Sequence, residues 1–294
     1  MASIDEILNL EEIDRNIYRG PIVPTAFQRT FGGQIAAQAL VAATKTVDRL
    51  FKVNSLHGYF LGAGEPRDHT LFLVERNRDG RSFASRTVNA VQHGKTIFTM
   101  QASFNIGGAA GIEHFDRMRE TPGPDEVKPG PLDGMTDTYR ALLEEWSDWD
   151  IRIVPQDVYS HNPYTASQQL VWFRSNADLP ADPMYHVCTL AYMSDMTLLQ
   201  TALVPHPGLE VQEASLDHAM WFLRPFRADE WLLYDQVSPS AADGRALSYG
   251  KVYDQEGRLV AAVMQEGITR LLREGAKAVP MTNLASKPTG SPRP

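Results

Sequence analysis

Two stretches of this sequence resemble each other, and this internal repeat constrains the fold more than any other feature. Three short matches occur in the same order in both stretches, and two of them share the same spacing. The matching pieces are Ser55-Leu56-His57 with Ser215-Leu216-Asp217-His218, Asp79-Gly80-Arg81 with Asp243-Gly244-Arg245, and Met100-Gln101 with Met264-Gln265. Matches in a constant order indicate a duplicated unit, so we expect two related halves.

The sequence of each half predicts one long helix between strands. The first helix is expected over residues 31–47, where apolar residues recur on one face with helical spacing. The residues on this face are Ile35, Ala39, Ala42 and Thr46. The second helix is expected over residues 184–203, after Asp182-Pro183, which is a favourable helix start.

The predicted strands lie on both sides of these helices. A candidate strand precedes each helix, at residues 16–24 and 168–175, and a segment of about four strands follows each, at 54–105 and 215–270. Asp79-Gly80 divides two strands of the first segment and predicts a type I′ turn. Each half therefore runs strand, helix, then about four strands.

Glycine, proline and acidic residues mark the boundary between the halves. We expect an N-terminal half over residues 1–108, a linker over 109–150 with a short helix near 138–146, and a C-terminal half over 151–284 that carries the catalytic residues. Residues 285–294 are expected to form a disordered tail.

The composition fits a folded protein with a sizeable core and argues against nucleic acid as a partner. Of the 294 residues, 43% are apolar and 22% are charged, and the net charge is −8, whereas nucleic acids bind basic surfaces. Cys188 is the only cysteine, so no intrachain disulfide can form.

The sequence shows neither a signal peptide nor an apolar run near the roughly 20 residues that a membrane span needs. We therefore expect a cytoplasmic protein that does not cross a membrane.

One residue breaks the pattern of the second predicted helix. Val187, Ala191, Asp195, Leu198 and Ala202 follow one another at three- and four-residue spacing, so Asp195 falls on the apolar face formed by the other four. A buried carboxylate is costly unless it is hydrogen-bonded, protonated or functional. A structural hydrogen bond and a catalytic role both fit this pattern. The eight His residues show no metal-ligand spacing, so no metal site is expected.

Several short segments together resemble the type II acyl-CoA thioesterases over most of the chain. These segments are Phe31-Gly32-Gly33-Gln34, Leu56-His57-Gly58-Tyr59-Phe60-Leu61, Ser194-Asp195, Leu216-Asp217-His218-Ala219-Met220-Trp221-Phe222 and Gln265-Glu266-Gly267. The resemblance implies an α+β double hotdog, in which two antiparallel sheets are each wrapped around one long helix and the halves pair through their sheets.

The resemblance also implies a catalytic set of an Asp, a hydroxyl residue and a Gln, which carry over to Asp195, Ser215 and Gln265. Many relatives have Thr at the position of Ser215, so the hydroxyl is kept and a methyl is missing. These side chains would direct a water molecule that hydrolyses fatty acyl-CoA to fatty acid and CoA without a covalent intermediate. No cofactor is expected, because coenzyme A is part of the substrate, and hotdog proteins readily form homo-oligomers.

Three further residues are weaker candidates for oxyanion or substrate binding. Gly33 and Gln34 lie at the expected start of the first helix, whose free N–H groups would stabilise a developing oxyanion. His57 is expected near the site, although a core histidine fits equally well. Gln101 is interpreted as the first-half counterpart of Gln265. Because the first helix has no Asp on its apolar face, we expect one active site per chain.

Two other functions stay open at this point. A hotdog hydratase or dehydratase would pair His57 with Asp195 to move a proton at carbon, and a non-catalytic acyl-CoA-binding protein would keep the fold without turnover. The presence of Ser215 and Gln265 beside Asp195 favours hydrolysis over both. Candidates to bind the CoA phosphates are Arg81, Arg86 and Arg245.

Overall fold

The computed structural model describes residues 3–25, 27–129, 145–209 and 211–272. The first half contains α1 (Ile4–Leu8), β1 (Glu11–Asp14), β2 (Ile17–Arg19), α2 (Gly32–Thr44), β3 (Lys52–Phe60), β4 (Leu71–Asp79), β5 (Phe83–Gln92) and β6 (Lys95–Asn105). The second half contains β7 (Trp149–Ile153), β8 (Ser167–Ser175), α4 (Pro183–Met193), η2 (Leu199–Leu203), β9 (Val211–Ser215), β10 (Asp217–Phe222), β11 (Leu232–Ala242), β12 (Arg245–Asp254) and β13 (Leu259–Leu271).

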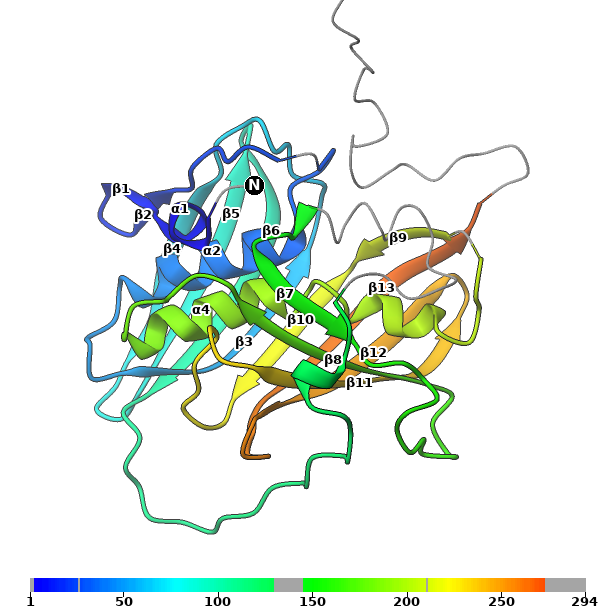
Figure 1. The fold of residues 1–294 in the computed structure, drawn as a ribbon. Helices are drawn as coiled ribbons and strands as arrows, with labels where there is room; N and C mark the ends of the chain where they lie inside the picture. The colour runs from blue at the N-terminus through cyan, green and yellow to red at the C-terminus, as the bar shows by residue number, and fades with distance from the viewer. Residues whose placement is uncertain (1–2, 26, 130–144, 210, 273–294) are drawn as a thin grey trace, which may run out of the picture.

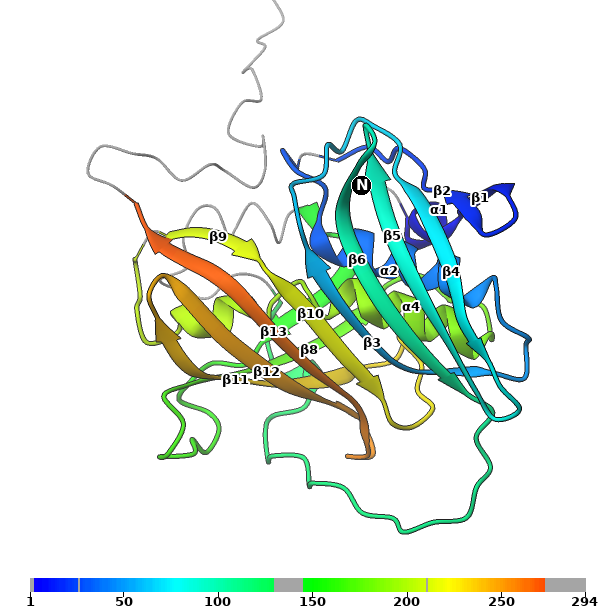
Figure 2. The ribbon, with the colours of Figure 1, turned by 180° about the vertical axis from the view of Figure 1, so that it is seen from behind.

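The described strands of both halves form one continuous antiparallel sheet of 13 strands, where two paired sheets were predicted (Figure 2). The order is β1-β2-β4-β5-β6-β3-β10-β13-β12-β11-β8-β7, and β9 pairs with β13. This order is symmetric about β3 and β10, which pair with Gly58 opposite His218. The halves join here because each of these strands satisfies the backbone groups that the other would leave unpaired at an edge.

The helices α2 and α4 lie against each other on one face of the sheet (Figure 1). Alanines fill the buried side of α2, and Ala37, Ala39, Ala42 and Ala43 are fully buried. Such small side chains let a helix approach its neighbours closely while still favouring helical backbone. α4 begins where expected, because Pro183 occupies its first turn and the Asp182 side chain accepts a hydrogen bond from the Met184 N–H.

The second helix is shorter than predicted. The sequence pattern predicts a helix to residue 203, but α4 ends at Met193 and a 3₁₀ helix, η2, follows at Leu199. The hydroxyl oxygen of Ser194 lies 3.1 Å from the Ala191 carbonyl oxygen. Beyond it the backbone bonds tighten, as in the bond from Met196 N–H to Met193 O at 3.1 Å. Asp195 therefore lies in a turn after α4 rather than on a helix face.

The hairpin at Asp79-Gly80 also differs from its prediction. Neither residue has positive φ, and the loop is longer than two residues, because β5 begins at Phe83 and Gly80 N–H donates to Phe83 O at 3.0 Å. The corresponding hairpin has φ of 53° at Asp243 and 70° at Gly244, as a type I′ turn requires.

Residues 106–129 run from the end of β6 to the second half and contain one 3₁₀ turn, η1 (Pro124–Glu126) (Figure 1). Trp172 Nε1 donates to Pro122 O at 2.9 Å, and Arg119 pairs with Asp235, so this segment is held against β8 and β11. β7 begins at Trp149, inside the segment 109–150 that is predicted as linker. The predicted tail, 285–294, and most of the predicted helix 138–146 lie outside the described residues.

Candidate active site

Three polar side chains from distant parts of the chain meet beside the end of α4. Asp195 comes from the turn after that helix, Ser215 ends β9, and Gln265 lies on β13. Gln265 Nε2 donates to Asp195 Oδ1 at 2.6 Å and to Ser215 Oγ at 2.7 Å. The Ser215 hydroxyl lies 3.3 Å from the same carboxylate oxygen and donates to it.

The strand geometry explains why Gln265 points inward. Alternate residues of β13 face the interior, so the side chains of Ala261, Val263 and Gln265 are buried while that of Met264 is exposed. The amide of Gln265 is fully buried and therefore needs partners. Its two N–H groups find them in Asp195 and Ser215.

The Asp195 carboxylate has an unusual environment. Burial raises its pKa to about 6, against the opposing effect of hydrogen bonds from Gln265, the Gly33 backbone and Ser215. At neutral pH this carboxylate is mostly ionised, yet its pKa is close enough to 7 for it to accept and return a proton. This combination is typical of a general base.

The first turn of α2 packs directly on this carboxylate. A Cβ on Gly32 would lie 2.6 Å from Asp195 Oδ2, and a Cβ on Gly33 would lie 2.4 Å from the Tyr192 carbonyl oxygen. Both positions therefore need glycine. The Gly33 N–H bonds the Asp195 carboxylate, and the positive end of the helix dipole adds to its stabilisation.

The predicted oxyanion donors thus already have partners in this structure. Gly33 N–H is directed to Asp195, and Gln34 N–H lies 3.1 Å from Phe31 O within the first turn. Gly32, one position earlier, lines the cavity described next.

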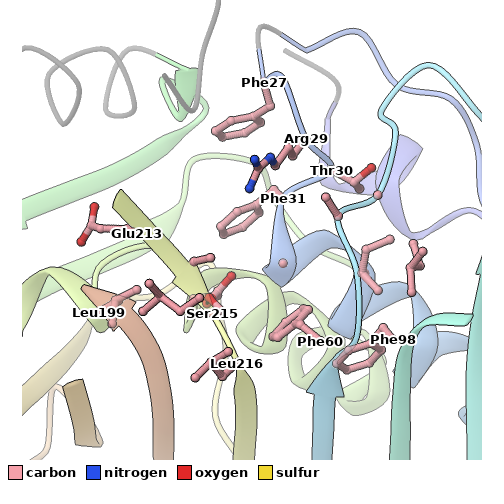
Figure 3. Close-up of a pocket in the computed structure, with 18 of the residues that line it drawn as sticks. Phe27, Arg29, Thr30, Phe31, Phe60, Phe98, Leu199, Glu213, Ser215 and Leu216 are labelled. Carbon is pink, nitrogen blue, oxygen red and sulfur yellow. The ribbon is translucent and has the colours of Figure 1, made fainter. Parts of the chain in front are cut away.

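A cavity of about 290 Å³ opens in front of Asp195 and Ser215. Aromatic and aliphatic side chains form most of its wall, which includes Phe27, Phe31, Phe60, Phe98, Ile97 and Leu199. Ser215 and Glu213 lie on one side of this space, across from Phe60 and Phe98 (Figure 3). Such a wall suits an apolar ligand that presents one polar, reactive group to the carboxylate.

Glu213 was not expected from the sequence. It lies two residues before Ser215 on β9, so both side chains reach the same cavity. Burial raises the pKa of Glu213 to about 7. Gln200 Nε2 donates a hydrogen bond to Glu213 Oε2 at 3.3 Å. The predicted strand segment begins at residue 215, so it did not include Glu213, and two-residue alternation back from Ser215 is the signal that identifies it.

His57 does not join this site. Its neighbour Leu56 is fully buried, whereas His57 points to the exposed face of β3, where its ring lies 4.8 Å from that of Trp221. The pairing of His57 with Asp195 that the hydratase interpretation requires is therefore not formed.

The first half lacks an equivalent set of side chains. Thr46 follows the end of α2 by as many residues as Asp195 follows that of α4, but Arg86 fills the space beside it. The guanidinium is 1% exposed and donates to Thr46 Oγ1 at 2.8 Å and to Thr46 O at 3.0 Å. Arg86 is thus a structural residue, not a ligand for CoA phosphates.

The interpretation of Gln101 as the counterpart of Gln265 is wrong. Gln101 is exposed. In the first half the buried residue paired with Arg86 is Ala102, and in the second half the buried residue paired with Ser248 is Gln265, so Ala102 holds the position that corresponds to Gln265.

Within the described ranges, no group of three or more His, Cys, Asp or Glu side chains is placed to hold a metal. None of the described helices is long and apolar enough to cross a membrane.

Known proteins share both the sequence and the fold. Residues 144–268 match the family model "Acyl-CoA thioesterase", and residues 22–105 match "Acyl-CoA thioesterase N-terminal domain". Acyl-coenzyme A thioesterase 8 of Mus musculus is 40% identical over 288 residues, which cover 91% of this chain and 89% of that protein. The crystal structure of acyl-CoA thioesterase II TesB2 from Mycobacterium marinum is 54% identical, with a TM-score of 0.82 and coverage of 92% of this chain and 100% of that one.

This chain belongs to the type II acyl-CoA thioesterases. It is accordingly an acyl-CoA thioester hydrolase. The fold is a hotdog: a protein from Alicyclobacillus acidocaldarius described as having a hot dog fold aligns with a TM-score of 0.76 at 20% identity, over 92% of this chain and 98% of that one.

Proposed function

We propose that this thioesterase hydrolyses fatty acyl-CoA with a water molecule activated by Asp195, Ser215 and Gln265, and that no covalent intermediate forms. The observation that carries this proposal is the contact of three side chains from separate segments at the wall of one apolar cavity. We further propose that the continuous sheet comprises two hotdogs, with this site in the second.

The chemistry assigns one task to each side chain. Asp195 accepts a proton from water as the water oxygen bonds to the thioester carbonyl carbon. Ser215 and Gln265 fix the carboxylate and the direction of attack. The tetrahedral intermediate then collapses, the C–S bond breaks, and the proton held by Asp195 passes to the departing CoA sulfur. The products are a fatty acid and CoA with its free thiol.

We propose that Ser215 orients the attacking water and is not itself the nucleophile. A serine nucleophile needs a base that removes its proton and is in turn oriented by a third group. The Ser215 hydroxyl instead contacts the carboxylate of Asp195 and the amide of Gln265, while the nearby His218 ring bonds Ser194. Water attack therefore agrees better with these contacts.

The oxyanion is proposed to bind at the first turn of α2. Gly33 N–H is directed to Asp195, so the Gly32 N–H, at the first position of the helix, is the better donor. Gly32 borders the cavity and has no side chain to keep a thioester away.

The apolar wall and the position of His57 favour this function over the alternatives. A hydratase needs a His beside the carboxylate, and His57 faces the other side of the sheet. A binding protein without turnover gives no reason for a buried amide to hold a carboxylate and a hydroxyl together. A cytoplasmic location and a homo-oligomer remain predictions.

The test is to measure the release of free CoA thiol from acyl-CoAs of increasing chain length. The proposal expects release that favours longer, fatty chains, and no acyl-enzyme mass when reactions are acid-quenched during turnover. An acylated protein would contradict direct water attack. Formation of 3-hydroxyacyl-CoA from enoyl-CoA, without thiol release, would instead support the hydratase.

A further inference from the structure

A second pair of hydrogen-bonded polar side chains, His218 and Ser194, lies behind the proposed catalytic side chains and does not line the cavity. His218 on β10 is 1% exposed, and its Nε2 lies 2.8 Å from the Ser194 hydroxyl oxygen. Ser194 immediately precedes Asp195 and is itself fully buried. No step of the proposed reaction uses either residue. Burying such polar groups costs free energy unless they are hydrogen-bonded, so their partners matter.

His218 and Gln265 are neighbours across two paired strands. The β10–β13 register places Ala219 opposite Met264, so the next pair along the strands is His218 and Gln265. Both side chains point to the buried face. The side chain of Gln265 raises the pKa of His218 against the larger lowering by burial, as an amide oxygen that accepts from the ring would.

Each of the two side chains has one buried polar atom left over. In the part of the chain that the structure describes, neither His218 Nδ1 nor Gln265 Oε1 has a hydrogen-bond partner. One can donate and the other can accept. Burial lowers the pKa of His218 to about 4, so the ring is neutral at pH 7 and carries a single proton.

The surrounding contacts select the position of that proton. The single hydroxyl proton of Ser194 can be directed to the Ala191 carbonyl oxygen at 3.1 Å or to His218 Nε2 at 2.8 Å. With the proton on the shorter contact to Nε2, the ring proton resides on Nδ1 and is directed to Gln265 Oε1. The amide is then held at both ends, because its nitrogen donates to Asp195 and Ser215. A flipped amide would present its oxygen to the Asp195 carboxylate, which would repel it.

We propose that His218 is a positioning residue for this reaction, which through its Nδ1–H, set by Ser194, holds the Gln265 amide in the orientation that serves Asp195 and Ser215. This inference rests on the proposed function, because it acts through the same three side chains.

The test compares two amides at position 218. An Asn side chain places its amide nitrogen near the position of His Nδ1, whereas a Gln side chain reaches the position of Nε2. His218→Asn should keep most of kcat, while His218→Gln and His218→Leu should lower kcat about tenfold or more with little change in KM. In the latter two variants the acid limb of the pH–rate profile should move to higher pH, because Gln265 no longer helps to keep Asp195 ionised.

Two controls separate positioning from a general loss of structure. His186 is as buried as His218, but its Nδ1 accepts from the Ala228 N–H, so His186→Asn should leave the acid limb in place. In a Gln265→Ala background, His218→Leu should have no further effect on kcat. Should His218→Leu fail to fold, the comparison of Asn with Gln still decides.

Equal kcat values and equal acid limbs for His218→Asn and His218→Gln would overturn the inference, as would additive losses in the double variant. Failure of the proposed function has a different signature: Asp195→Asn would then retain the thiol release of the unsubstituted protein, whatever the His218 variants do.

Discussion

The amide nitrogen of Gln265 lies 2.6 Å from the carboxylate oxygen Oδ1 of Asp195, although the two residues are 70 positions apart in the chain. This bond joins the inner face of β13 to the turn after α4. It satisfies a buried amide and favours the ionised carboxylate at the same time. Three predictions concern the surroundings of this pair, a fourth concerns Arg86 in the first half, and a fifth tests the carboxylate itself.

The rate of hydrolysis should fall as the pH is lowered through about 6. The pKa of Asp195 is raised to about 6 by burial, and only the ionised form accepts a proton from water. Glu213 borders the same cavity with a pKa of about 7, so its contribution must be separated. The pH profile of kcat for Glu213→Gln should keep its acid limb near pH 6, and loss of that limb would assign it to Glu213 instead.

Gly32→Ala should lower kcat about 10- to 100-fold. The new Cβ would lie 2.6 Å from Asp195 Oδ2 and 3.0 Å from Phe60 Cζ, so the carboxylate must move from its place. Gly111→Ala is the matched control, because its Cβ meets no atom within 4 Å. Steady-state kinetics on both variants check this, and wild-type kcat in Gly32→Ala would mean that the carboxylate need not stay there.

Ser215→Thr should retain activity, whereas Ser215→Ala should lose about 10- to 100-fold in kcat. Threonine keeps the hydroxyl that donates to Asp195 and accepts from Gln265, and the neighbouring cavity leaves space for its methyl. Ser103→Ala, on the partly buried β6 strand of the first half, provides a matched change elsewhere. Equal activity of the Thr and Ala variants would show that the hydroxyl has no role.

Arg86→Met should destabilise the protein by about 2–4 kcal/mol without changing KM for acyl-CoA. The guanidinium donates to the carbonyl oxygens of Thr46, Arg78 and Ser85, which would lose their bonds in the buried first half. Arg81→Met, at an exposed position, should change the free energy of unfolding by less than about 0.5 kcal/mol. Urea unfolding measures both, and a raised KM in Arg86→Met would return Arg86 to the candidates for phosphate binding.

The architecture was largely predictable from the repeat and the periodicity. Strand, helix and about four strands occur twice, and helix starts such as Asp182-Pro183 were visible because capping is local chemistry. The end of α4 was not predictable from spacing, since the apolar pattern continues through the turn and η2 while the backbone bonding changes. The joining of the halves into one sheet depends on β3 and β10, whose pairing is a contact between distant segments.

The candidate site, too, was predictable only in part. The unusual burial of Asp195 was evident from the sequence, but Ser215 and Gln265 came from the family resemblance. Register explains the errors: a shift of one residue along a strand reverses its faces, so Gln101 points outward although its dipeptide matches that of Gln265. His57, expected either near the site or in the core, lies on the exposed face of β3. Glu213 was missed because β9 has no counterpart in the first half.

The most direct test of the account is kcat for thiol release from a long-chain acyl-CoA by Asp195→Asn, which keeps the shape of the side chain and one acceptor oxygen for Gln265 and Ser215 but removes its basicity. Asp243→Asn, at an exposed turn with positive φ that asparagine tolerates, is the matched control. We predict that Asp195→Asn is folded and loses at least about 100-fold in kcat, with KM little changed, while the control keeps full activity. Wild-type kcat in a folded Asp195→Asn protein would contradict the account.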